Sequence, residues 1–115
     1  MAFLALAVAA CGSASSQTSS AVSLGSAVRQ GCTSVADVLS DGPDPGSDPV
    51  GYAEAQVLPL RQLAISDATL HSAVLTLASA YQTFSTSTTS TRAASSAAVT
   101  NAENEVNKIC PQAAQ

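Results

Sequence analysis

Apolar residues recur along the chain at alternating steps of three and four, a spacing that places side chains on one side of an α-helix. The pattern occurs in four segments, which polar or Pro- and Gly-rich stretches separate. The clearest segment follows Asp67, a residue type that commonly caps helix N-termini. Its apolar positions are Leu70, Val74, Leu77, Tyr81 and Phe84. Because this segment carries most of the bulky apolar side chains, we expect it to form the centre of the core.

Three weaker segments share this periodicity. The first begins at Ala21, and its apolar side consists of Ala21, Gly25, Val28, Cys32, Val35 and Leu39. The second covers residues 52–66, with apolar positions at Ala53, Val57, Leu60 and Ala64. The last ends near Pro111, with apolar positions at Val99, Ala102, Val106 and Ile109. In this last segment Glu103 and Glu105 fall off the apolar stripe, so we expect both to point outward.

Three residues are expected to disturb these helices. Glycine weakens a helix by about 1 kcal/mol relative to alanine, so we expect the first helix to fray or kink near Gly31. Pro59 lacks an N–H donor, so the second helix should kink or restart there. Pro111 disfavours helical geometry at the residue before it, so the last helix should stop at Cys110.

The stretches between the segments are predicted loops. Residues 40–51, SDGPDPGSDPVG, contain three prolines and three glycines, which prevent a regular ladder of backbone hydrogen bonds. The polar run 85–91 is expected to connect the third and last helices. One hypothesis is that this loop binds calcium through Asp41, Asp44 and Asp48. The spacing of these aspartates does not match the EF-hand pattern. Aspartates are common in turns, and that interpretation is favoured.

Each helical segment has a narrow apolar stripe that it cannot bury alone. Packing several such helices together buries all the stripes, and short connections make neighbouring helices run in opposite directions. The sequence therefore predicts an all-α fold over residues 21–110: a small antiparallel bundle of three to four helices, with residues 111–115 as a C-terminal tail.

The N-terminal stretch has a different character. From Phe3 to Ala10 every residue is apolar, a run of eight that falls far short of the roughly 20 residues of a membrane-spanning helix. Val8-Ala9-Ala10-Cys11, followed by Gly12, resembles the bacterial lipobox. The resemblance implies that residues 1–10 are a signal peptide, that Cys11 carries a diacylglycerol, and that the Ser-rich residues 11–20 are a tether. The first three residues, MAF, lack a positive charge, so either the true start lies upstream, which we favour, or the signal is defective. The alternative is an N-terminal helix with Cys11 as a small buried residue.

The chain has three cysteines, which leaves one over if two of them pair. With Cys11 as the lipidation site, Cys32 and Cys110 would form a disulfide in an exported protein. This disulfide would close a long loop of the chain. In chain-entropy models, closing a loop of that length stabilises a fold by roughly 4 kcal/mol. The alternative is two free thiols in a cytosolic protein. No metal site is expected, because the cysteines lie far apart and the only histidine, His71, has no second ligand at zinc-like spacing.

Composition narrows the classes of function. Only 10% of the 115 residues are charged and the net charge is -4, so no basic patch is available for nucleic acid. Phosphate-binding loops, nucleophile elbows and paired carboxylates in an apolar setting are all missing from the sequence, which has a single histidine. We therefore expect a protein that is not an enzyme and that holds no cofactor.

Residues 48–84, together with the ICP motif at 109–111, resemble small exported proteins of actinobacteria whose role is uncharacterised. The resemblance implies an exported helical domain rather than an activity. We expect a lipoprotein anchored at the outer face of the cell membrane, whose domain contacts the wall or an envelope protein. The alternative is a carrier of lipid or haem, in which Tyr52, His71 and Tyr81 supply polar contacts.

Overall fold

The computed structural model describes residues 25–111, and within that range all regular secondary structure is helical. The elements are α1 (Ser26–Leu39), α2 (Pro49–Gln62), α3 (Ala68–Ser85) and α4 (Arg92–Ile109). The all-α prediction is confirmed. The predicted signal peptide, lipidation site and tether, and the tail beyond Pro111, lie outside the described residues.

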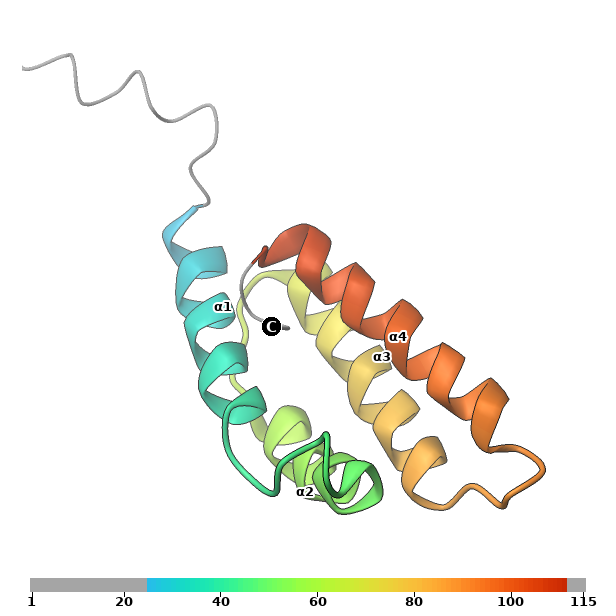
Figure 1. Ribbon diagram of the computed structural model, residues 1–115. Coiled ribbons are helices and arrows are strands. Elements are labelled where there is room, and N and C mark those ends of the chain that lie inside the picture. Colours follow the sequence, from blue (N-terminus) through green and yellow to red (C-terminus); the bar gives the residue numbers. More distant parts are fainter. Residues whose placement is uncertain (1–24, 112–115) are drawn as a thin grey trace, which may run out of the picture.

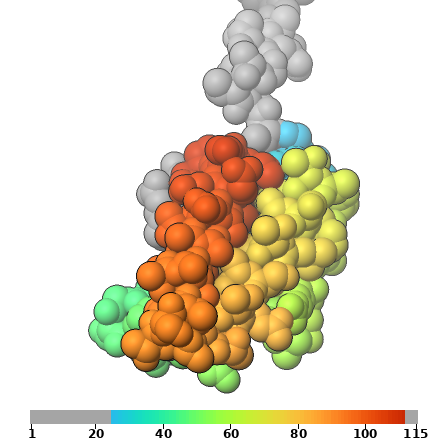
Figure 2. Space-filling model, turned by 90° about the vertical axis from the view of Figure 1, so that its right-hand side faces the viewer, coloured from blue at the N-terminus to red at the C-terminus, as the bar shows by residue number. Residues whose placement is uncertain are grey.

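The four helices form a small antiparallel bundle in which α3 is central (Figure 1). Helix α3 packs extensively against both α2 and α4, while α1 packs against α2 and α3. Helices α3 and α4 lie side by side along one face of the molecule (Figure 2). The predicted bundle architecture is therefore confirmed.

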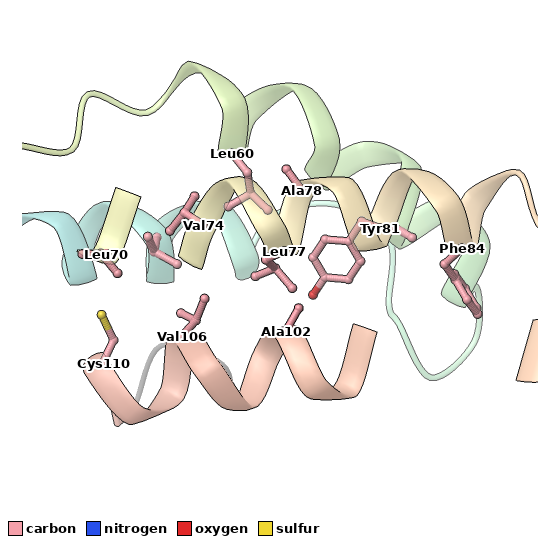
Figure 3. Close-up of a cluster of buried hydrophobic side chains, with 12 residues drawn as sticks. Leu60, Leu70, Val74, Leu77, Ala78, Tyr81, Phe84, Ala102, Val106 and Cys110 are labelled. Carbon is pink, nitrogen blue, oxygen red and sulfur yellow. The ribbon is translucent and has the colours of Figure 1, made fainter. Parts of the chain in front are cut away.

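The side chains of α3 form the middle of the core. All five apolar positions predicted for this helix, Leu70, Val74, Leu77, Tyr81 and Phe84, are buried (Figure 3). The other three helices each contribute one fully buried large apolar side chain, namely Val35, Leu60 and Val106. The Asp67 carboxylate caps the helix, as predicted, by accepting a hydrogen bond of 2.9 Å from the Leu70 backbone N–H.

Helix α1 continues through Gly31, and the expected fraying there is wrong. Gly31 is buried, and a Cβ atom at this position would lie only 2.6 Å from Leu70 Cδ2. The missing side chain thus permits close approach of α1 to α3. Tertiary packing compensates for the poor helix propensity of glycine.

Helix α2 continues through Pro59 to Gln62, so the expected restart is wrong. The ring of Pro59 is exposed. The buried side of α2 also differs from the prediction, because it consists of Ala53, Gln56 and Leu60. Val57 is only partly buried, and Ala64 lies beyond the end of the helix in an exposed position.

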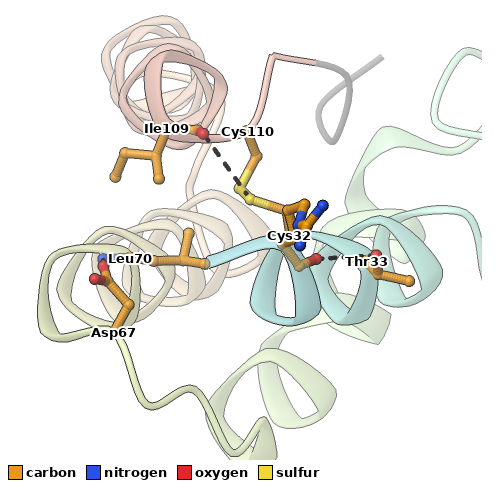
Figure 4. Close-up of a disulfide and its surroundings, with 7 residues drawn as sticks. Cys32, Thr33, Asp67, Leu70, Ile109 and Cys110 are labelled. Atoms are coloured by element: carbon orange, nitrogen blue, oxygen red, sulfur yellow. Dashed lines mark hydrogen bonds between the residues drawn. A yellow bond between two sulfur atoms is a disulfide. The ribbon is translucent and has the colours of Figure 1, made fainter. Parts of the chain in front are cut away.

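A disulfide joins Cys32 of α1 to Cys110 at the C-terminal cap of α4, as predicted (Figure 4). The two Cα atoms are 5.5 Å apart although the residues are separated by 78 positions in the sequence. The bond therefore braces the first helix against the last. None of the described helices combines the length and the hydropathy needed to cross a lipid bilayer.

Candidate functional site

The loop after α1 and the helices α2, α3 and α4 border a cavity of about 190 Å³ that is half open to solvent. Residues that line it include Pro45, Tyr52, Tyr81, Phe84, Val99 and Glu103. We call it the tyrosine cavity. Tyr81 and Phe84 lie toward the opposite end of α3 from Leu70 and the disulfide residue Cys110 (Figure 3).

Two tyrosine rings meet at the cavity. Tyr52 of α2 and Tyr81 of α3 have ring centroids 5.8 Å apart and ring planes at 85°, an edge-to-face arrangement. Tyr81 is only 3% exposed, whereas Tyr52 is partly buried. The chain contains only these two tyrosines, so both of its phenol groups belong to one site.

Each tyrosine hydroxyl is held by a hydrogen bond to a different helix. The Tyr81 hydroxyl donates to Glu103 Oε1 of α4 at 3.0 Å. The Tyr52 hydroxyl donates to the backbone carbonyl of Leu39, the last residue of α1, at 2.6 Å. These two bonds restrain the direction of both rings, and they join α3 to α4 and α2 to α1.

The prediction that Glu103 points outward is wrong. Glu103 is partly buried, and its carboxylate lines the cavity beside Tyr81. Glu105 does face solvent, where it forms an ion pair of 2.7 Å with Lys108. The missed signal is a spacing: Glu103 follows Val99 by four residues, so it borders the apolar stripe of α4.

The environment of the cavity keeps both phenols protonated. Burial raises the pKa of Tyr81 strongly, and the negative charge of Glu103 raises it further. Burial also raises the pKa of Tyr52, to which the Glu103 charge adds. At neutral pH the site therefore contains two neutral phenols beside one acidic side chain.

Gln56 is a buried polar residue that the sequence interpretation missed. Its side chain is 1% exposed, and Nε2 donates a hydrogen bond of 2.7 Å to the backbone carbonyl of Asp41. Oε1 has no hydrogen-bond partner among the described residues. Gln56 thereby ties the loop after α1 to α2. It follows the buried Ala53 by three residues, and that spacing was the available signal.

The structure brings together two of the three residues predicted to contact a carried ligand. Tyr52 and Tyr81 share the tyrosine cavity, but His71 does not line it. His71 lies ten residues before Tyr81 on α3, which corresponds to about 15 Å along the helix axis. The polar groups of the cavity are thus the two phenols and Glu103, without a contribution from the imidazole.

The loop aspartates have local structural roles. Asp44 accepts hydrogen bonds of 3.0 Å from the Gly46 backbone N–H and from the Ser47 hydroxyl. Asp48 caps α2 by accepting 2.9 Å from the Gly51 backbone N–H. Across residues 25–111, no three His, Cys, Asp or Glu side chains are grouped so that they could hold a metal ion.

Comparison with protein families, curated proteins and solved structures gives no match for this chain.

Proposed function

We propose that this protein is a non-enzymatic lipoprotein of the cell envelope. Cys11 carries the lipid and holds the chain at the outer face of the cytoplasmic membrane. The helical domain then contacts the wall or another envelope protein. Residues 1–10 serve as the signal peptide, and residues 11–20 connect the lipid to the domain.

The disulfide is the observation that supports export most directly. Structural disulfides persist in oxidising compartments and are rare in the cytosol, where thiols are kept reduced. Cys32 and Cys110 sit at bonding distance in the folded domain, and Cys110 is only 2% exposed. The VAAC-G motif upstream supplies a reason for export and for membrane attachment.

The chemistry of the tyrosine cavity favours binding over catalysis. A general base needs a pKa near the working pH, and a nucleophile needs such a base beside it. Both phenols have raised pKa values and donate their protons to fixed acceptors. The imidazole of His71 does not line the cavity.

The lipid or haem carrier has less support. Pockets for drug-sized ligands usually occupy about 300 Å³ or more. The tyrosine cavity, at about 190 Å³, is smaller than that. A carried lipid or haem would require the helices around the cavity to move apart.

Metabolic labelling tests the proposed lipidation. Bacteria that export lipoproteins are fed labelled palmitate while they express the full coding region, as wild type or with Cys11→Ser. We expect the wild type to take up the label and Cys11→Ser to lack it. The matched control is the double variant Cys32→Ser/Cys110→Ser, which keeps Cys11 and should retain the label. Equal labelling of wild type and Cys11→Ser would refute the proposal.

A further inference from the structure

The membrane-anchored role leaves the tyrosine cavity unexplained. Its walls bring three aromatic rings and one carboxylate together from three different helices. Tyr52 comes from α2, Tyr81 and Phe84 come from α3, and Glu103 comes from α4. A site assembled from separate elements requires the whole fold, and its chemistry selects the ligand that it fits.

The shape of the cavity fits a compact group. The Tyr52 and Tyr81 rings stand at 85° to each other and form a corner, and Phe84 adds a third aromatic wall. Pro45 and Val99 provide further apolar surface. A volume of about 190 Å³ holds roughly six water-sized groups at about 30 Å³ each. That room suits the head of a small molecule.

The charge at the cavity is negative and uncompensated. Glu103 Oε1 accepts the Tyr81 hydroxyl, and no ion pair to Glu103 is found in residues 25–111. All four Lys and Arg residues of the chain fall in that range. Lys108 is paired with Glu105, and neither residue contributes to the cavity.

Arg92 contacts one of these aromatic walls. Its guanidinium carbon lies 5.5 Å from the centroid of the Phe84 ring, and its nitrogens donate to the hydroxyl and the carbonyl of Ser87. Arg92 does not line the cavity. Because Phe84 already has this cationic neighbour and Tyr81 is only 3% exposed, the Tyr52 ring is the main aromatic surface that remains for a ligand.

We propose that the tyrosine cavity binds a small organic ammonium ion, with the partly buried Tyr52 ring against its carbon groups and the Glu103 carboxylate, held by the Tyr81 hydroxyl, opposite its positive charge. Aromatic rings attract cations through the negative charge on their faces, and alkylated ammonium ions exploit this because they are weakly hydrated. An anion would be repelled by Glu103. A neutral apolar ligand would desolvate that carboxylate without compensation.

The chain offers its own spectroscopic probe for this site. It contains no tryptophan, and its two tyrosines are both walls of the cavity. Tyrosine fluorescence of the full chain therefore reports on the site. We would titrate the full chain with choline chloride, using sodium chloride at equal ionic strength as the baseline.

The neutral control ligand is 3,3-dimethylbutan-1-ol, in which a carbon atom replaces the choline nitrogen. We expect a saturable tyrosine signal with choline, and an apparent affinity for the alcohol that is lower by about tenfold or more. Equal responses to the two ligands would overturn the proposal, as would a choline titration that does not saturate.

Two matched variants on α4 separate the role of the site from a general charge effect. Glu103→Gln removes the charge but retains an oxygen that accepts the Tyr81 hydroxyl, and it should weaken choline binding by about tenfold. Glu105→Gln removes the same charge from the exposed side of α4 and should leave the affinity unchanged. Equal weakening by both variants would overturn the proposal. Far-ultraviolet circular dichroism confirms that each variant is folded before it is titrated.

Discussion

The hydroxyl of Tyr81 donates a 3.0 Å hydrogen bond to the Glu103 carboxylate and thereby connects α3 to α4 at the wall of the tyrosine cavity. Glu103 lies on the same helix as the exposed pair Glu105–Lys108, but in a different environment. One carboxylate contributes to a site between helices, whereas the other stabilises only the surface of α4.

Ionisation of the tyrosines should be delayed relative to free tyrosine, whose pKa is about 10. Burial raises the pKa of both Tyr52 and Tyr81, and the charge of Glu103 adds to the effect. The folded state then binds more phenolic protons than the unfolded state above that pH, so the free energy of unfolding should fall as the pH rises past about 10.

Tyrosinate absorbance and urea unfolding, measured between pH 8 and pH 12 as a rough working range, check this prediction. In Glu103→Gln the absorbance transition should move to lower pH, because one negative charge is removed. Ionisation of both tyrosines near pH 10 in the folded wild type would contradict the described burial of the site.

Replacement of Gly31 by alanine should destabilise the fold although alanine is the better helix former by about 1 kcal/mol. The new Cβ would lie 2.6 Å from Leu70 Cδ2, and Leu70 is fully buried, so the core must shift. Overpacking of this kind costs roughly 1–3 kcal/mol.

The control for this prediction is Gly25→Ala, where a Cβ would meet nothing within 4 Å. Gly25 is the N-cap of α1, where alanine is less favourable than glycine, so this change should cost at most about 1 kcal/mol. Urea denaturation of both variants provides the comparison. A stabilising effect of Gly31→Ala would show that α1 does not pack closely against α3.

Loss of the disulfide should weaken the domain. The bond between Cys32 and Cys110 closes most of the described chain, and removal of such a bond typically costs 2–5 kcal/mol. The double variant Cys32→Ser/Cys110→Ser should therefore unfold at lower urea concentration than the oxidised wild type. If the urea midpoint of the wild type is the same before and after reduction, the disulfide does not contribute to stability.

The centre of the bundle was predictable because the α3 segment has a strong period and a clear cap. Large apolar residues at steps of four and three determine which side of the helix is buried, and Asp67 marks the start of the helix. The cysteine pairing was also predictable, since the count and the lipobox left Cys32 and Cys110 for each other.

Other features depend on how the helices pack, which a local pattern does not contain. Gly31 is a poor helix former in isolation, but here it allows two helices to approach closely. Pro59 does not end α2, where its ring is exposed. The sequence pointed to Tyr52 and Tyr81 as polar contacts, but only the packing of α2 on α3 brings their rings within 5.8 Å.

Mass spectrometry of the mature N-terminus, after expression of the full coding region in a bacterium that exports lipoproteins, tests the proposed function most directly. We expect an N-terminal peptide that begins at Cys11 and carries a diacylglycerol, with residues 1–10 removed. An unmodified chain that retains Met1 and remains in the cytosol would contradict the account.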